Sequence, residues 1–507
     1  MSPVEAALRA ENAQLREALT ARDARIAELL ARLARLEHLL GADSTNSATP
    51  SSKDSIAAKA KRKADRKARR DNGLSSRERS ADRRRGGQPG HLGSGLVRDP
   101  DPDDVKDVEP PARCRSCACE LGPDADAGCS WSQTWDIPRI ELSRLEYRLP
   151  RRRCGGCGTV TVAAPPHGQA ATITYGPNVN AAAVFLVNHG NVPVELSADL
   201  MATLLGAEVS TGFVVKAAQR LSAQLNATGF DQAMKAALRA EPVLGADESP
   251  VNVVAPDIDE DTGEPPPGAP HLMVINSPDR GLVFYAPMPS RSGDAIEAVG
   301  VLDGYTGYLV RDGYSAYQRF EDTLAGVQQC CVHIIRRCKR VLPLGPGGLQ
   351  NWAKTIQQTL RQANAAVQEA KAAGRDGLDP DVLAGLRARY DKAVEFGITH
   401  NRHRDWDEGN HPAYALARWL KAKADQVWLF TTTFAVPWTS NSSEQSVRGP
   451  KRHQAISGYW QTTTTLGHYC RNKTYITTAR NNGVHPMDAI HAALAGHPWL
   501  PAVPAPG

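Results

Sequence analysis

Two pairs of cysteines have the spacing of metal ligands. Cys114 and Cys117 form one Cys-x-x-Cys pair, and Cys154 and Cys157 form a second one after 36 intervening residues. Each pair brings two thiolates to one turn, and four thiolates complete the tetrahedral coordination of a structural Zn²⁺ with no open position. The alternative is two redox-active dithiols. We predict one structural Zn²⁺ in a zinc-ribbon module over about residues 105–165.

The other cysteines of this region do not repeat the spacing. Six of the ten cysteines lie between Cys114 and Cys157, which indicates metal binding in a reducing compartment rather than a disulfide scaffold. Cys119 and Cys129 could compete as ligands, but Cys119 breaks the paired pattern, and we interpret both as spare small residues. The stretches 135–138 and 142–149 alternate as strands do and predict the ribbon between the pairs.

Two carboxylates stand where predicted strands would present them to a cation. Asp247 falls inside an apolar run, where an unpaired carboxylate is costly unless it binds a cation. Asp312 directly follows a predicted strand, at the end that faces a cleft in α/β sheets. The alternatives are a hairpin cap for Asp247 and a turn residue before Gly313 for Asp312. The residue pattern leaves these alternatives open.

The elements that must position these acids are predicted between residues 241 and 480. The pattern gives strands at 243–254, 271–277, 281–287, 307–311 and 327–331 and helices at 294–302 and 333–341. A charged, Ala-rich region over about 345–425 has the composition of a helical insertion. Two last helices are predicted at 466–481 and 487–495, so that residues 481–507 hold a C-terminal helix and tail. We expect an α/β core.

A heptad pattern covers residues 1–41. Eight of ten a and d positions are apolar, Asn12 occupies an a position, and Gly41 ends the helix. The alternative is a lone amphipathic helix packed on its own domain. A polar segment follows and leaves no adjacent core for such a helix to cover. We therefore predict a coiled coil, a leucine zipper that joins the chain into a homodimer or higher homo-oligomer.

The segment 42–104 is basic and has almost no large apolar residues, which predicts a disordered linker. Residues 59–85 hold 13 Lys and Arg against 4 Asp and Glu, a net +9, so the rest of the chain carries −4 of the total +5. The alternative to DNA phosphate contact is a merely solubilising segment. The expected DNA-binding residues are Lys61, Arg62, Lys63, Arg83, Arg84 and Arg85.

Between residues 175 and 240 the pattern is helical. Two short helices at 196–205 and 210–221 are joined at Gly206, as in a helix-turn-helix or as in an ordinary helical packing unit. The longest apolar run of the chain, 181–187, is far shorter than the ~20 residues that cross a bilayer. We expect no membrane span and no secretion signal.

Several motifs, in order along nearly the whole chain, resemble one family. The chain is similar to the Asp-Asp-Glu (DDE) transposases of bacterial insertion sequences, in the branch called the insertion-sequence-sixty-six family. The matching motifs are Asp43-Ser-Thr-Asn-Ser, Pro50-Ser-Ser-Lys-Asp54, the four paired cysteines, Ala246-Asp-Glu-Ser-Pro250, Arg311-Asp-Gly-Tyr-Ser-Ala-Tyr317, His333 and Arg336 after Cys330, Asn441-Ser-Ser-Glu444, Ile456-Ser-Gly458 and Thr474-Tyr-Ile-Thr-Thr-Ala-Arg480.

The resemblance implies a multi-domain protein with an N-terminal coiled coil, a zinc-ribbon module, a helical DNA-binding region and a ribonuclease-H-like catalytic core with a helical insertion. It implies Asp247, Asp312 and Glu444 as catalytic residues and as ligands of two Mg²⁺ or Mn²⁺ ions. The family tends to have Asp-Asn-Asn before the Glu and Arg directly after it, whereas this chain has Thr439-Ser440-Asn441 and Gln445.

Two basic residues after Glu444 are expected to hold DNA near the metal ions. Arg448 and Lys451 would share a helix with Glu444, although Gly449 and Pro450 predict that this helix ends early. The alternative is a solvated basic face.

The implied activity is DNA cleavage and strand transfer at the terminal repeats of an insertion sequence and at target DNA. Accessory proteins of the same element could take part, and we expect a cytoplasmic bacterial protein associated with the nucleoid. The competing interpretations are a non-catalytic zinc-dependent DNA-binding protein, either a regulator or a decayed transposase, and a ribonuclease-H-like nuclease without strand transfer.

Overall fold

The computed structural model describes residues 95–138, 140–165, 173–255, 269–406 and 409–503, with Arg16, Leu19, Arg22 and Arg25, which are helical. Most of the predicted coiled coil and the linker up to residue 94 lie outside the described residues. The basic linker residues named above lie there too. These interpretations therefore stay predictions. The chain divides into two units, one of residues 57–142 and the other of residues 1–56 and 143–507, and each is described by itself.

Residues 95–142 contain little regular structure. The one helix described there is the short 3₁₀ helix η2 (Pro123–Ala125). The other unit continues after residue 142 with a two-stranded antiparallel hairpin of β1 (Arg151–Arg153) and β2 (Val160–Val162). The strands predicted at 135–138 and 142–149 are wrong, because the described residues there form no strand. Leu142, Leu145 and Leu149 are exposed, and no strand within the described ranges pairs with this segment.

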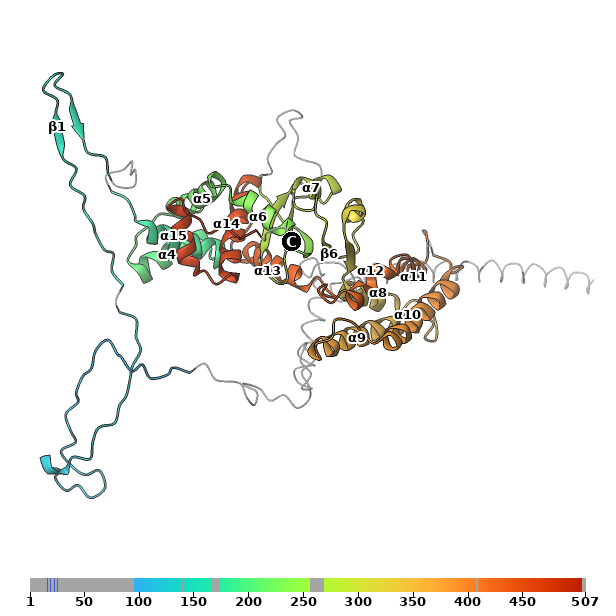
Figure 1. Ribbon diagram of the computed structural model, residues 1–507, viewed down its shortest axis with the longest axis horizontal. Helices are drawn as coiled ribbons and strands as arrows, with labels where there is room; N and C mark the ends of the chain where they lie inside the picture. Colours follow the sequence, from blue (N-terminus) through green and yellow to red (C-terminus); the bar gives the residue numbers. More distant parts are fainter. Residues whose placement is uncertain are drawn as a thin grey trace, which may run out of the picture. The chain divides into compact units, whose positions relative to one another are not determined.

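A five-stranded mixed sheet forms the centre of the larger unit, as Figure 1 shows. Its order is β5-β4-β3-β6-β7, with β3 antiparallel to β4, β4 antiparallel to β5, and β3, β6 and β7 parallel. The bounds are β3 Val243–Pro250, β4 His271–Asn276, β5 Val283–Met288, β6 Tyr308–Arg311 and β7 Gly326–Gln329. These elements confirm the five strands predicted from the apolar runs.

Both faces of the sheet are covered, because alternate side chains of its strands point to opposite faces. Met273 and Ile275 belong to a core shared with α3 to α6 and α15, whereas Leu272 and Val274 pack with residues of α13 and α14. These helices are α3 Pro177–Val184, α4 Val194–Leu205, α5 Thr211–Ala227, α6 Phe230–Arg239, α13 Asn441–Ile456, α14 Thr463–Asn481 and α15 Pro486–Leu494. The π-helical turn η4 (Phe185–His189) continues α3.

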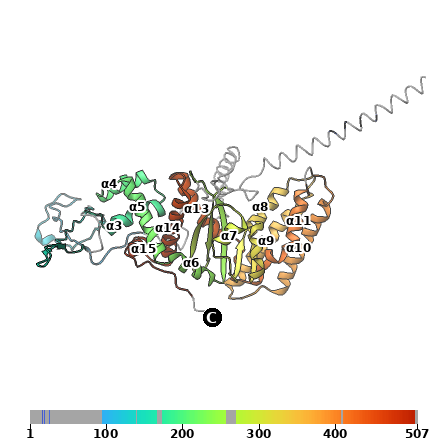
Figure 2. The same cartoon turned by 90° about the horizontal axis from the view of Figure 1, so that it is seen from above.

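A second apolar core lies among the helices that follow β7. Cys331, Ile334 and Cys338 of α8 pack with side chains of α9 to α12, such as Trp352 and Tyr390. The bounds are α8 Cys331–Val341, α9 Asn351–Ala372, α10 Pro380–Asn401, α11 Pro412–Ala422 and α12 Ala424–Thr432. Figure 2 shows these helices on one side of the sheet and α13 and α14 on the other. The helices predicted over about 345–425 are thereby confirmed.

The chain between β5 and β7 forms α7 (Gly293–Ala298) before β6 and the 3₁₀ segment η5 (Ser315–Thr323) after it. The helices predicted before and after the sheet are present as α4, α5, α8, α14 and α15. The expectation that the helix of Glu444 ends at Gly449 and Pro450 is wrong, because α13 runs to Ile456 with Pro450 inside it. None of the described helices is both long and apolar enough to cross a bilayer.

Candidate active site

Asp247 lies inside β3, and Asp312 directly follows the neighbouring parallel strand β6. The parallel register of β3 and β6 pairs Gly245 with Val310, and each aspartate comes two residues later on its own chain. Carboxyl ends of adjacent parallel strands meet at one edge of a sheet, where α/β proteins bind ligands. The structure therefore brings together the two acids that the sequence singled out.

Glu444 reaches this edge because α13 packs closely on β3. The Ser443 hydroxyl donates to Asn276 Oδ1 at 2.5 Å, and a Cβ added to Gly245 would lie 2.5 Å from Ser443 Oγ. Only glycine at position 245 leaves room for this approach. Glu444, the next residue on α13, is thereby held close to Asp247 on β3.

Asp247 lies close enough to Asp312 and Glu444 for their charges to act on its carboxyl group. Burial raises the pKa of Asp247 well above its usual range, and the negative charges of Glu248, Asp312 and Glu444 raise it further. A nearby cation would favour the ionised form of such a carboxyl group. Strongly shifted pKa values of this kind occur often at functional sites.

Glu248 points away from Asp247 and organises the layer behind the site. Its carboxylate forms an ion pair with Arg291 and accepts a hydrogen bond from the Tyr317 hydroxyl at 2.6 Å. Arg291 also lies 3.7 Å from Asp312 Oδ2, and Asp312 Oδ1 accepts the Tyr314 N–H at 2.9 Å. Arg291 therefore connects the buried Glu248 to the exposed end of the site and fixes the Asp312 carboxylate.

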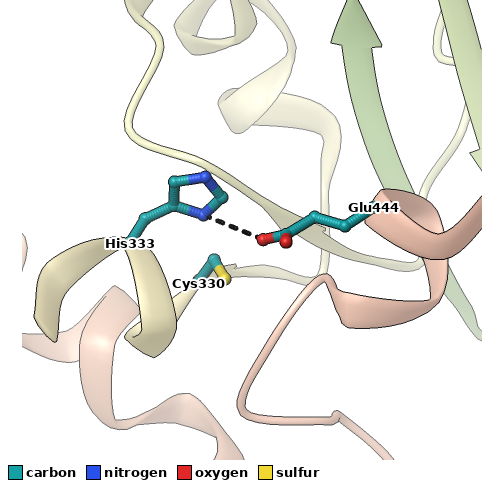
Figure 3. Close-up of side chains that lie close together, drawn as sticks. All are labelled: Cys330, His333 and Glu444. Atoms are coloured by element: carbon teal, nitrogen blue, oxygen red, sulfur yellow. Dashed lines mark ion pairs between the residues drawn. The ribbon is translucent and has the colours of Figure 1, made fainter. Parts of the chain in front are cut away.

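Helix α8 contributes a second set of contacts to Glu444. Glu444 Oε1 lies 3.6 Å from His333 Nδ1, and Oε2 lies 3.5 Å from the Arg336 guanidinium. Figure 3 shows the His333 and Cys330 side chains directed toward Glu444. Cys330 is buried between β7 and α8, and its Sγ accepts the backbone N–H of Ser440 at 3.4 Å. Glu444 thus lies between the sheet edge and two basic groups of α8.

Among the described residues, one group of side chains has possible metal-ligand atoms that all lie within 4.8 Å of one another. It consists of Cys330, His333 and Glu444. Burial alone would lower the pKa of His333, but the Cys330 thiol and the charges of Glu444 and Asp312 outweigh it and raise the pKa to about 9. Burial would raise the pKa of the Cys330 thiol, yet His333 and Ser440 lower it. Thiolate, imidazole and carboxylate together suit Zn²⁺ better than Mg²⁺.

The two basic residues predicted to contact DNA differ in their surroundings. Arg448 is exposed on α13, one turn after Glu444. Lys451 is half-buried, and its ammonium donates to the carbonyl oxygen of Pro250 at the end of β3. The continuation of α13 beyond Pro450 is what places both side chains on the helix of Glu444.

The two cysteine pairs form turns of the same geometry. Ala118 N–H donates to Cys114 O and Gly158 N–H donates to Cys154 O, both at 2.9 Å, and Ala118 and Gly158 both have positive φ, +60° and +71°. Each first cysteine N–H donates to the carbonyl five residues later at 2.8 Å. Tight turns of this kind direct two thiolates to one side, as zinc knuckles do. The pairs fall in different units of the chain, and the four-cysteine site stays a prediction.

Arg291 and the Cys330–His333 pair were not predicted as site residues. Arg291 lies between β5 and α7, and no local motif marks it. Glu248 could have indicated that such a residue exists, because a carboxylate inside a buried strand requires a cationic partner. The spacing of Cys330, His333 and Arg336 was part of the family resemblance, but only the fold brings them to Glu444.

Comparison with known protein families gives two matches. Residues 172–466, which include β3 to β7 and α13, match the model of the Transposase IS66 family. Residues 1–96 match a family of unknown function (DUF6444). No match was found among curated proteins.

Proposed function

The chain belongs to the Transposase IS66 family, and we propose that it cleaves and joins DNA at Asp247, Asp312 and Glu444 by metal-dependent phosphoryl transfer. The observation that carries this proposal is the convergence of Asp247, Asp312 and α13 at one edge of the sheet. The sheet order, three antiparallel strands followed by two parallel ones, supports a ribonuclease-H-like core.

The donor set fits hard divalent cations. Three carboxylates from distant parts of the chain supply oxygen ligands, which Mg²⁺ and Mn²⁺ prefer. Burial, and after it the neighbouring negative charges, raise the pKa of Asp247, and a bound cation would offset both effects. We propose that these residues hold two such ions. When bound, the ions supply activation of the attacking oxygen and stabilisation of the leaving oxygen at the phosphodiester.

The surrounding residues keep the acids in place. Arg291 and the Tyr314 N–H orient the Asp312 carboxylate, and His333 with Arg336 orients Glu444. Arg448, exposed one turn along α13, lies where it can contact the phosphate backbone of the DNA strand. In this proposal the first step is attack of water on the phosphodiester at the element end. The freed 3′ hydroxyl then attacks target DNA.

The rest of the proposed assembly rests on the sequence. A structural Zn²⁺ held by Cys114, Cys117, Cys154 and Cys157 would order the segment before the core. A zipper over residues 1–41 would pair two chains and so two element ends, and the basic linker would add contacts to DNA that do not depend on sequence. We further propose that the protein acts in the cytoplasm on the bacterial chromosome, with or without accessory proteins of its element.

The deciding experiment is cleavage and joining of DNA that carries the terminal repeats of the element, with Mg²⁺ or Mn²⁺ present. Asp312→Asn should abolish both reactions while DNA binding persists, because it removes a negative ligand without changing the fold. Asp303→Asn is the matched control, since Asp303 is exposed in the turn before β6. Wild-type activity in Asp312→Asn would refute the catalytic assignment. Binding without cleavage in the wild type would favour a DNA-binding protein without catalysis.

A further inference from the structure

Basic side chains from three helical elements meet where η4 and α13 approach α14. They are His189 of η4, Arg452 and His453 of α13, and Lys473 and Arg480 of α14. In the part of the chain that the structure describes, no carboxylate forms an ion pair with Arg452, Lys473 or Arg480. The cluster is therefore an uncompensated concentration of positive charge in the larger unit.

Lys473 is the most buried member of the cluster, with 6% of its surface exposed. Its ammonium lies 3.4 Å from the carbonyl oxygen of His189, and a Cβ added to Gly449 would lie 3.3 Å from its Cε. The lysine stem thus lies against the backbone of α13. Burial, together with the charges of Arg452 and Arg480, lowers the pKa of this ammonium to about 8.

Arg480 and His189 also face each other without an acid between them. Arg480 Nη1 donates to His189 Nε2 at 2.8 Å, so the imidazole is neutral and carries its proton on Nδ1. That Nδ1 is buried and has no hydrogen-bond partner among the described residues. Burial and the nearby Lys473 and Arg480 lower the pKa of His189 to about 4, which is consistent with the neutral ring.

The backbone around His189 is held in an unusual conformation. The helix α3 ends in the π-helical turn η4, a feature that occurs often at functional sites. Asn191 has φ +56°, and a Cβ at Gly190 would lie 2.7 Å from the carbonyl oxygen of Leu186. Surrounding contacts must maintain such geometry, and the Ser457 hydroxyl of the α13 end donates to Asn191 O at 2.9 Å.

A buried ammonium surrounded by cations lowers the stability of the fold. Strongly shifted groups of this kind occur often at functional sites, where a bound ligand of opposite charge compensates them. We propose that Arg452, Lys473 and Arg480, with His189, form a binding site for a phosphate group of the DNA backbone.

The position of the cluster relates it to the candidate active site. Arg448 and Arg452 are exposed four and eight residues after Glu444, and so lie on the same face of α13. At 1.5 Å per residue the helix carries Arg452 about 12 Å from Glu444. If the proposed function is correct, a strand bound at Glu444 follows this face to the cluster. The phosphate site itself does not depend on catalysis.

The test is DNA binding by the full chain without divalent metal, so that no cleavage step enters. A fluorescent duplex of arbitrary sequence is titrated at several salt concentrations with wild type, Lys473→Met and Arg480→Gln. Each variant should bind the duplex several-fold more weakly. The plot of the logarithm of the DNA-association constant against the logarithm of the salt concentration should become less steep by about 1, because one phosphate contact is lost. Lys354→Met, an exposed lysine on α9, is the control and should leave affinity and slope unchanged.

A second measurement separates an anion site from a structural role. Lys473→Met should raise the melting temperature at pH 7, since it removes an uncompensated buried charge. Wild-type affinity and slope in both Lys473→Met and Arg480→Gln would overturn the proposal. So would a lowered melting temperature of Lys473→Met with unchanged DNA binding by Arg480→Gln, because Lys473 would then serve the fold alone.

A third measurement distinguishes a site for DNA backbone phosphate from a site for free inorganic phosphate. Calorimetric titration with inorganic phosphate at constant ionic strength should show no strong binding, because the backbone is the intended ligand. Strong phosphate binding that Lys473→Met removes, with DNA affinity unchanged, would replace the DNA proposal by a small-anion site. The titrations contain no divalent metal and no cleavage step, so failure of the catalytic proposal leaves this test intact.

Discussion

The Tyr285 hydroxyl on β5 donates a hydrogen bond of 3.2 Å to the carbonyl oxygen of Ser446 on α13. Ser446 lies four residues before Pro450, which has no N–H to complete the helical hydrogen bond. Tyr285 therefore supplies the donor that proline lacks. This contact helps α13 continue past Pro450, and it links the helix that carries Glu444 to the edge strand of the sheet.

Removal of this hydroxyl should loosen α13. In Tyr285→Phe the Ser446 carbonyl loses its donor, at a cost of about 1–3 kcal/mol in the free energy of unfolding. DNA cleavage should fall as well, because Glu444 depends on the placement of α13. Urea unfolding and cleavage rates measure the two effects. Tyr459→Phe, at an exposed tyrosine, should change neither.

A double-mutant cycle with Pro450→Ala tests the cause. Alanine at position 450 provides an N–H for Ser446 O, so Tyr285→Phe should cost less in the Pro450→Ala background than in the wild type. Equal costs in both backgrounds would show that Tyr285 stabilises the chain through packing alone, and the proposed compensation for Pro450 would be wrong.

Two threonines of α14 form hydrogen bonds with the backbone groups of the edge strand β5 that no neighbouring strand among the described residues pairs. Thr478 Oγ1 accepts the Val283 N–H at 3.1 Å and donates to Val283 O at 3.0 Å, while Thr474 Oγ1 accepts the Tyr285 N–H at 2.9 Å. The edge strand is thereby closed against pairing with another chain.

Thr478→Val keeps the side-chain shape and leaves two buried backbone groups of Val283 without partners. We expect a loss of about 2–4 kcal/mol in the free energy of unfolding, since each unsatisfied group costs about 1–3 kcal/mol. Chemical denaturation measures the loss, with Thr464→Val at an exposed position of α14 as control. A change below about 0.5 kcal/mol, typical of surface substitutions, would mean that Thr478 is not needed to satisfy β5.

The strands were predictable because their apolar runs are local signals, and Asp312 follows such a run directly. Glu444 was not predictable from local signals, because α13 is polar and contains Gly449 and Pro450. Its helix is stabilised by distant residues, namely Gly245, which admits Ser443, and Tyr285. Only the family resemblance indicated Glu444 in advance.

The region between the cysteine pairs shows the opposite error. Alternating residues at 142–149 satisfied the strand pattern, yet a strand also needs a partner and a surface to cover. The hairpin forms instead at β1 and β2, around the turn of Cys154 and Cys157, where Gly158 adopts positive φ. Turn geometry decided the pairing there.

The zinc prediction has a direct chemical test. Metal analysis of the purified chain should give about one equivalent of Zn²⁺, as four thiolates bind one ion. Cys154→Ser should lose it, because one knuckle then has a single thiolate. Cys129→Ser should retain it, since Cys129 stands outside both turns. A full equivalent in Cys154→Ser would exclude the four-cysteine ligand set.

Excess zinc should inhibit cleavage through the Cys330–His333–Glu444 group. A thiophilic ion bound by Cys330 Sγ and His333 would also bind the Glu444 carboxylate, which the proposed Mg²⁺-dependent reaction requires. We expect Cys330→Ser to raise the Zn²⁺ concentration for half-inhibition by about 10-fold or more, as loss of a thiolate ligand weakens zinc binding. Cys129→Ser is again the control. The same inhibition in Cys330→Ser would assign the effect to another site.

Lys473 should make the stability of the fold depend on pH. Its pKa is about 8 in the folded chain, against 10.5 for a lysine in water, so between these values the unfolded chain binds a proton that the folded chain releases. The free energy of unfolding therefore rises with pH across this window. The groups that face Lys473 are Arg452, Arg480, His453 and His189. The two histidines do not titrate in this window, because burial lowers the pKa of each to about 4.

Lys473→Met should remove this dependence. The variant should exceed the wild type in stability by up to about 3 kcal/mol at pH 7, where the buried ammonium is charged, and by less as the pH approaches 10. Urea unfolding of both proteins at several pH values between 7 and 10 measures the difference, and Lys354→Met should follow the wild type throughout. A difference that stays constant with pH would mean that Lys473 is compensated in the folded chain, which would also remove the physical reason for an anion at the cluster.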